Sequence, residues 1–298
     1  MRRALRVVGL GEVLWDMLPG GKQLGGAPTN FAYMASLLGD EGIVASRVGR
    51  DSLGIDARDA MHHLGLKVRY LQQDPGHPTG TAAVSLDDGG QPRFTITGPV
   101  AWDFLDFSAE WQTLAGTADV VCFGTLAQRS VVSRSTIHAF LLAACGSLRV
   151  FDVNLRQSHF SPEILRESLR LSHIVKLNQE ELPVVAELVG LAPGSEVGKA
   201  TALLDAYGLQ LVCVTRGPAG SLLLGRDQIS ECPGVSVKVA DAVGAGDAFT
   251  ACLVHHYLRK APLREINAAA NRFAAWVASQ PGGTPRLPED MRKELLEK

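Results

Sequence analysis

Three features are missing from the sequence, and each absence excludes a class of protein. The five cysteines are scattered, odd in number and never spaced as Cys-x-x-Cys, so we expect free thiols and neither a disulfide framework nor a zinc site. No block of like charge occurs: 29 Lys and Arg stand against 31 Asp and Glu, and this net charge of −2 gives no electrostatic reason to bind nucleic acid or a membrane surface. No apolar run is long enough to span a bilayer.

The N-terminus also lacks the pattern of a secretory signal. Its basic residues are followed by only a brief apolar run before Glu12. The sequence contains no Asn-x-Ser/Thr sequon either. Together these absences predict a protein of the reducing cytoplasm.

What the sequence does contain is the alternation typical of an α/β protein. Short β-branched runs alternate with longer segments of helical period, which predicts a mainly parallel sheet sandwiched by helices. We expect strands at 5–10, 42–48, 119–123, 148–153, 173–177 and 211–215. We expect helices at 28–38, 53–64, 130–144, 196–207, 245–258 and 263–279.

One stretch breaks this rhythm and predicts a small inserted β-lid. Segments 80–86 and 92–97 form two strands joined by the turn sequence Asp-Asp-Gly-Gly at 87–90, with no helix between them. The irregular segment 12–24 could pair with that hairpin. We therefore assign 11–24 and 78–98 to a discontinuous lid, and 1–10, 25–77 and 99–298 to an α/β core.

The densest chemical signal is the small-residue turn from Asp241 to Phe249, which runs straight into an apolar helix. Unpaired N–H groups at a helix N-terminus bind anions, most often phosphate. A carboxylate at Asp247 would repel that phosphate unless it has a task, such as accepting a proton from an attacking hydroxyl. An ordinary helix start with an acidic first turn is the alternative.

A second glycine turn, Gly25-Gly26-Ala-Pro-Thr-Asn30, lies where the lid rejoins the core. A hinge fits this place, and simple turn-and-cap chemistry is the alternative. The two turns resemble the two signatures of the PfkB or ribokinase family of carbohydrate kinases, and the resemblance covers essentially the whole chain. It implies a ribokinase-like fold with a nucleotide-binding core, and transfer of phosphate from ATP to a primary sugar hydroxyl with Mg²⁺.

The resemblance also implies roles for single residues of the second turn. Asp247 would be the catalytic base, and Gly244, Ala245 and Gly246 would form the anion hole for the γ-phosphate. Family members often hold K⁺ beside this hole through the carboxylate that Asp241 matches, with carbonyls from a loop such as 280–283. Val243 replaces the Thr of some K⁺-dependent relatives, so a K⁺ site stays open.

Further motifs match the family's nucleotide side. Asn178-Gln-Glu-Glu181 resembles the Asn-x-x-Glu pattern, in which Glu181 would organise Mg²⁺ through water; a helix-cap pair is the alternative. The residues expected to contact the nucleotide are Asn178, Thr215, Gly217, Gly220 and Asn271. An ordinary hairpin turn at 215–220 and a surface Asn at 271 are the competing interpretations.

On the sugar side the match is closest to fructokinases. Asp16, Gly25, Gly26 and Asn30 would bind the sugar hydroxyls; Trp102 could stack on the sugar or be a core aromatic, and Arg156 could lie near phosphate or substrate or form a surface ion pair.

We therefore expect phosphorylation of D-fructose at its 6-hydroxyl by a homodimer. The alternatives are a kinase for 2-keto-3-deoxygluconate, to which Arg156 or Arg93 could offer a cation, and a nucleoside kinase. A non-catalytic sugar or nucleotide sensor is the alternative from another class.

Overall fold

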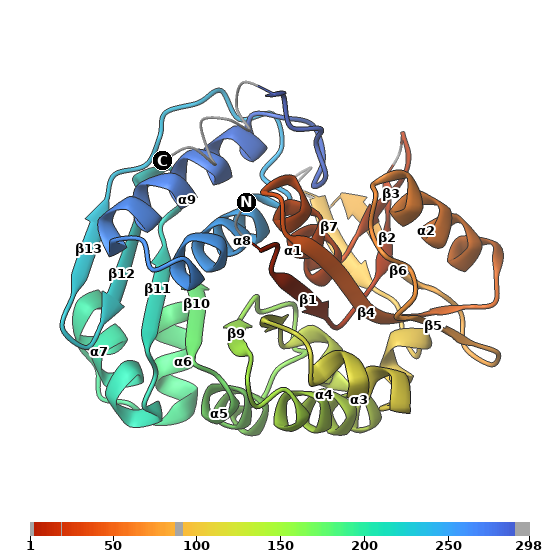
Figure 1. Cartoon of the computed structure of the whole chain (residues 1–298), viewed down its shortest axis with the longest axis horizontal. Coiled ribbons are helices and arrows are strands. Elements are labelled where there is room, and N and C mark those ends of the chain that lie inside the picture. The colour runs from red at the N-terminus through yellow and green to blue at the C-terminus, as the bar shows by residue number, and fades with distance from the viewer. Residues whose placement is uncertain (1–2, 19, 87–91, 290–298) are drawn as a thin grey trace.

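The computed structural model describes residues 3–18, 20–86 and 92–289, and its centre is a nine-stranded sheet (Figure 1). The strand order is β13-β12-β11-β10-β9-β8-β1-β4-β5; all neighbours from β11 to β5 are parallel, and β12 and β13 complete one edge in antiparallel pairing. The strands are β1 (Arg6–Leu10), β4 (Glu41–Gly49), β5 (Leu71–Asp74), β8 (Val120–Phe123), β9 (Leu148–Asp152), β10 (Ile174–Asn178), β11 (Leu211–Thr215), β12 (Ser221–Gly225) and β13 (Ile229–Cys232).

Helices cover both faces of this sheet and bury two separate apolar clusters. Alternate strand residues face opposite clusters, as a pleated strand requires: Val7 lies in one and Val8 in the other. One face is covered by α1 (Ala27–Leu37), α2 (Ser52–His63), α8 (Ala245–Leu258) and α9 (Leu263–Ala278). The other is covered by α3 (Ala109–Ala115), α4 (Val131–Ala143), α5 (Pro162–Leu171), α6 (Glu181–Val189) and α7 (Glu196–Tyr207) (Figure 1).

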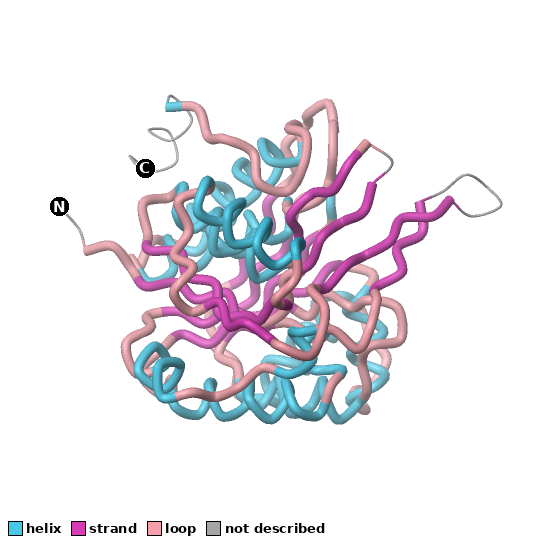
Figure 2. Tube along the Cα trace, turned by 90° about the vertical axis from the view of Figure 1, so that its right-hand side faces the viewer, coloured by secondary structure: helices cyan, strands magenta, loops and turns pink. Residues whose placement is uncertain are grey.

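A second, four-stranded sheet forms the lid. Its order is β3-β2-β6-β7, with β2 (Leu14–Leu18), β3 (Gly21–Gly25), β6 (Gly80–Leu86) and β7 (Pro92–Ile96). Figure 2 shows these strands extending away from the main body. At its base the lid packs on α2, where the Trp15 indole N–H donates to the Leu53 carbonyl.

The predicted α/β architecture, with a mainly parallel sheet between helices and a small β-lid, is confirmed. Every expected strand and helix is present, with each end within one residue of its prediction. The sequence did not indicate strands β5, β12 and β13 or helices α3, α5 and α6. The hairpin turn at 87–90 and the Arg93 side chain lie outside the residues and side chains that the structure describes.

Parallel strands place their carboxyl ends at one edge, where such sheets bind ligands. Here the segments that follow β1, β9, β10 and β11 meet the N-terminus of α8 at this edge, and the lid rises beside it (Figures 1 and 2). In the described part of the chain, no helix is both long and apolar enough to cross a membrane.

Candidate active site

The turn that opens α8 depends on a glycine at its first position. Gly244 has a φ of +78°, and a Cβ there would lie 2.7 Å from the Gly283 carbonyl oxygen. No side chain caps the helix, and the first N–H groups of a helix have no partner within it. The Ala245 N–H donates to the Ala242 carbonyl at 3.3 Å, so Gly244 and Gly246 present the backbone donors at the positive end of α8, where an anion site would form.

Asp247 lies in the first turn of α8 and is bonded to a residue at the start of α1, where the lid rejoins the core. The Asn30 side-chain amide donates to Asp247 Oδ2 at 2.9 Å. Burial, with a smaller contribution from Asp152, raises the pKa of Asp247 to about 6, while Asn30, Lys176 and Arg156 act in the opposite direction. The carboxylate is therefore ionised at neutral pH, and its pKa is close to the value expected of an efficient general base.

Lys176 is a residue of this site that the sequence analysis missed. It lies on β10, is 7 % exposed, and its ammonium group donates to Asp152 Oδ1 at 3.0 Å. Thr250, on α8, donates to the other oxygen of Asp152 at 3.1 Å. The only signal in the sequence is a single Lys inside the otherwise apolar run Ile-Val-Lys-Leu.

Glu12 is a second residue that was missed as a site group. It follows β1, is 3 % exposed, and its Oε2 is buried without a hydrogen-bond partner in the described structure. Burial, with a smaller contribution from Asp247, raises the pKa of Glu12 to about 7, while backbone hydrogen bonds and Arg156 act in the opposite direction. Glu12 thus adds a second buried carboxyl group to the surroundings of Asp247.

An apolar cavity of about 380 Å³ leads to the turn at α8. It brings together four residues that the sequence assigned to the nucleotide: Thr215, Gly217, Gly220 and Asn271. Its walls also include Val235, Val237, Val239, Phe249, Ala274, Ala275 and Ala278, and it ends at Ala245 and Gly246. An apolar cavity whose lining includes the first residues of α8 suits a nucleotide whose base enters the cavity and whose phosphates reach the helix.

Asn271 is held in a fixed orientation at the wall of that cavity. It is 7 % exposed, and its side-chain NH₂ donates to Ser221 Oγ at 2.7 Å and to the Asn267 carbonyl at 2.8 Å. The alternative of a surface asparagine is therefore wrong. The turn from Thr215 to Gly220 joins antiparallel β11 and β12, so it is both a hairpin turn and part of the cavity wall.

Glu181 and Asn178 form a clamp between two strand ends. Glu181 accepts the N–H groups of Leu155 and Asn178, each at 2.8 Å, one on each carboxylate oxygen. The Asn178 side chain in turn accepts the N–H of Glu181 at 2.8 Å. The described residues contain no group of three or more His, Cys, Asp or Glu that could hold a metal ion. A divalent ion fits here as one carried by phosphate oxygens and water, with Glu181 reached through water.

Asp241 ties the turn to the C-terminal loop. Its Oδ1 accepts the Val243 N–H at 3.0 Å and its Oδ2 accepts the Gly282 N–H at 3.2 Å. The structure therefore brings together the carboxylate and the 280–283 loop that the resemblance implied for K⁺. Each carboxylate oxygen accepts one backbone N–H and keeps a further lone pair.

Asp16 lies on β2, in the lid. Burial raises the pKa of Asp16, which Arg156 opposes. A Cβ on Gly25 would lie 2.5 Å from Asp16 Oδ2, and one on Gly26 would lie 2.5 Å from the Glu12 carbonyl. Arg156 lowers the pKa of Glu12, Asp16 and Asp247 alike, so its guanidinium serves three carboxyl groups.

The sequence assigned Trp102 to the sugar, with a core aromatic as the alternative, and the structure favours the alternative. Trp102 is fully buried, with the Arg129 guanidinium 4.1 Å from its ring centroid. Arg129 also pairs with Asp103 at 2.8 Å and donates to the Thr97 carbonyl at 2.6 Å, directly after β7. The ring has no face left for a sugar, so the structure replaces the predicted stacking with a structural role beneath the lid.

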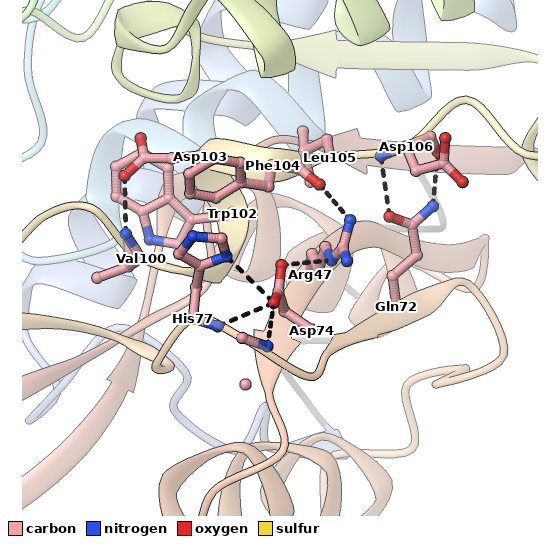
Figure 3. Close-up of polar contacts among 12 residues, drawn as sticks. Arg47, Gln72, Asp74, His77, Val100, Trp102, Asp103, Phe104, Leu105 and Asp106 are labelled. Atoms are coloured by element: carbon pink, nitrogen blue, oxygen red, sulfur yellow. Dashed lines mark hydrogen bonds and ion pairs between the residues drawn. The ribbon is translucent and has the colours of Figure 1, made fainter.

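A polar cluster fixes the segment that carries Trp102 (Figure 3). Asp74, at the end of β5, accepts the His77 backbone N–H at 2.9 Å and is ion-paired with Arg47 at 3.0 Å. Arg47 also donates to the Phe104 carbonyl, and the His77 ring stacks on Phe104 with centroids 3.7 Å apart. The base of the β6–β7 hairpin is thereby held against the core.

Comparison with known proteins gives consistent matches along the chain. Residues 18–290 match the model of the pfkB family carbohydrate kinases. Fructokinase of Escherichia coli is 30 % identical, with 96 % of each chain covered. The crystal structure of an uncharacterised sugar kinase of Pyrococcus horikoshii has a TM-score of 0.81 at 27 % identity, over 97 % of this chain and 96 % of the other. The structure of Vibrio cholerae fructokinase with fructose, ADP and calcium bound has a TM-score of 0.79 at 25 % identity, over 98 % and 99 %.

Proposed function

The chain belongs to the pfkB family of carbohydrate kinases, and we propose that it is a fructokinase that transfers the γ-phosphoryl group of ATP to the 6-hydroxyl of D-fructose. Membership of this family makes the chain an ATP-dependent sugar kinase. The observation that carries the proposal is the position of Asp247. It directly follows Gly246, which lines the apolar cavity, and it is bonded to Asn30 in the glycine turn where the lid rejoins the core.

In the proposed reaction the sugar oxygen attacks the γ-phosphorus, the bond from that phosphorus to the β,γ-bridging oxygen breaks, and ADP leaves. Asp247 takes the proton of the attacking hydroxyl. The N–H groups of Gly244 and Gly246 stabilise the charge on the transferred group. Mg²⁺ would neutralise charge on the ATP phosphates, and Glu181 is the carboxylate of this chain that would reach it through water.

The charges around the sugar side favour a neutral substrate. Glu12, Asp16 and Asp247 all interact with Arg156. A substrate carboxylate, such as that of 2-keto-3-deoxygluconate, would compete with these three groups for one guanidinium. A polyol instead offers hydroxyl donors to carboxylate acceptors. The fructokinases among the relatives support the same choice.

The experiment is an ADP-release assay with Mg-ATP and a panel of fructose, 2-keto-3-deoxygluconate, ribose, glucose and adenosine, run with Asp247→Asn in parallel. Turnover selective for fructose and lost in the variant supports the proposal. Selectivity for the keto acid would keep the mechanism and overturn the sugar. Adenosine selectivity would assign a nucleoside kinase, and ATP binding without turnover on any acceptor would favour a sensor.

Two properties of the whole protein complete the proposal. We propose a homodimer formed through the lids, because Met17 and Leu18 on β2 are 41 % and 39 % exposed. We also propose a cytoplasmic location, which agrees with five free cysteines. Light scattering of the purified protein tests the dimer, and a monomeric mass would overturn it.

A further inference from the structure

A buried ion pair lies directly beneath the phosphate-binding turn. Lys176 on β10 and Asp152 on β9 are 7 % and 5 % exposed, and their charged atoms are 3.0 Å apart. Thr250 Oγ1 donates to Asp152 and also lies 3.0 Å from the Gly246 carbonyl. The pair is therefore joined to the first turn of α8 as well as to two neighbouring strands.

Gly246 leaves room for the Lys176 ammonium group. A Cβ built on Gly246 would lie 2.9 Å from Lys176 Nζ, and no other atom outside the turn is as close to it. The backbone φ of Gly246 is not in the left-handed region, so its conformation alone does not require glycine. A side chain at 246 would therefore displace the Lys176 ammonium group from its position beside Asp152.

Lys176 and Asp152 have opposite effects on the ionisation of Asp247. Asp152 raises the pKa of Asp247, and Lys176 lowers it. Burial lowers the pKa of Lys176, but Asp152, Glu181 and Asp247 together raise it, so the lysine remains charged. The other groups that face Asp247 are Asn30 from α1, Glu12 after β1, Arg156 after β9 and the Cys122 thiol on β8.

We propose that the Lys176–Asp152 pair controls the proton affinity of Asp247, with the lysine favouring its ionised form and the aspartate opposing it. In this arrangement Lys176 and Asp152 are positioning residues that act through Asp247. The description of Asp247 as the base rests on the proposed function, but the electrostatic coupling does not.

The two residues predict opposite effects, which a purely structural role does not. Lys176→Met removes a positive charge, leaves Asp152 without its cation, and raises the pKa of Asp247 by about one unit or more. Asp152→Asn removes a negative charge, leaves the lysine free to attract Asp247, and lowers the pKa by a similar amount. Both substitutions break the same ion pair, so loss of packing alone would shift both variants in one direction or neither.

The test is a carbon-13 NMR titration of aspartate carboxyl groups in the full chain, with the Asp247 signal assigned by its absence in Asp247→Asn. Lys176→Gln serves as a second neutral variant if the methionine protein does not fold. Asp40→Asn is the matched control, because buried Asp40 is ion-paired at the other end of α8 with Arg259 at 2.8 Å and is hydrogen-bonded to His255 at 2.7 Å. His255 is eight residues from Asp247, about 12 Å along the helix, so this control should leave the Asp247 titration in place.

Opposite shifts in the two variants, with none in the control, support the proposal. Shifts of the same sign, or no shift, overturn it. The titration needs no turnover, so it decides the coupling even if every sugar fails as a substrate, which is the outcome that would overturn the proposed function. Where turnover is present, the acidic limb of kcat/KM should move with the titration in each variant.

Discussion

The side-chain amide of Asn30 donates to Asp247 at 2.9 Å although 217 residues separate them in the chain. Asn30 belongs to α1, which begins at the glycine turn where the lid rejoins the core, and Asp247 belongs to the first turn of α8. One hydrogen bond thus joins the segment where the lid meets the core to the proposed base. The N-terminal and C-terminal parts of the core must therefore both be folded before the two residues meet.

Asp247→Asn should reduce kcat by about 10²- to 10⁴-fold, the usual contribution of a general base. The amide keeps the size of the side chain and loses the proton acceptor, so the binding of fructose and ADP should change little. Turnover by quenched-flow and binding by calorimetry measure the two properties separately. Unchanged turnover would mean that another group takes the proton.

The activity of the wild-type protein should fall as the pH drops below about 6. Burial holds the pKa of Asp247 at about 6, and only the ionised carboxylate accepts a proton. Because the Asn30 hydrogen bond lowers this pKa, Asn30→Ala should move the acidic limb of the kcat/KM profile to higher pH. A limb that stays in place in the variant would show that Asp247 does not control it.

Glu12 should make the protein less stable as the pH rises from about 5 to 7. Its pKa is raised from 4.5 to about 7 in the folded state, so the folded protein binds this proton more tightly than the unfolded chain. The stabilisation is complete below the unfolded value and is lost as the pH rises through the folded one. The difference corresponds to about 3 kcal/mol.

Glu12→Gln removes this loss, so its free energy of unfolding relative to wild type should improve by up to about 3 kcal/mol between pH 5 and 8. Urea denaturation at each pH measures it. Glu187→Gln, at an exposed position on α6, is the control and should follow wild type. If the free energy of unfolding has the same pH dependence in wild type and Glu12→Gln, the pKa of Glu12 is not raised by folding.

Arg129 should support the lid more than the nucleotide site. Arg129→Met leaves the carboxylate of Asp103, which is 4 % exposed, without its cation, and it frees the Thr97 carbonyl after β7. Removing one partner of a buried pair costs about 3 to 5 kcal/mol. We expect a lower Tm, and a larger rise in KM for fructose than for ATP because the lid loses an anchor.

The exposed pair of Arg69 and Glu110 provides the comparison for Arg129. Their side chains are 72 % and 44 % exposed, so Arg69→Met should cost at most about 1 kcal/mol and leave both KM values in place. If Arg129→Met and Arg69→Met lose similar amounts of stability, the contacts of Arg129 do not support the lid.

The parts of the fold that local signals specify were predictable. Gly39 and Gly65 end two helices in the left-handed conformation, and the glycine turn at 244–246 begins another. Strands β5 and β13 are four residues long and have no such signal, because their pairing with β4 and β12 arises only in the folded sheet.

The residues of the site also fall into those that local sequence signals reveal and those that only the folded structure reveals. The motif at 241–249 could be read from its own residues, because a tight turn before a helix requires small side chains. Lys176 and Glu12 could not, because their properties come from burial next to residues distant in the chain. The choice between a sugar-stacking and a core Trp102 could not be made from the sequence for the same reason, because nothing local shows that Arg129 covers its ring.

The apolar cavity should be the site of ATP and not of the sugar, and a bulky residue on α9 can separate the two. Ala275 lines the cavity. Ala275→Phe should fill part of its volume of about 380 Å³, raise KM for ATP by about tenfold or more, and leave KM for fructose within about twofold. Ala268→Phe is the matched control, because it lies two turns earlier on the same face of α9 and does not line the cavity. Steady-state kinetics with each substrate varied in turn, together with calorimetry of ADP binding, measure the effect. A rise in KM for fructose alone, or equal effects of the two phenylalanine variants, would place the nucleotide elsewhere.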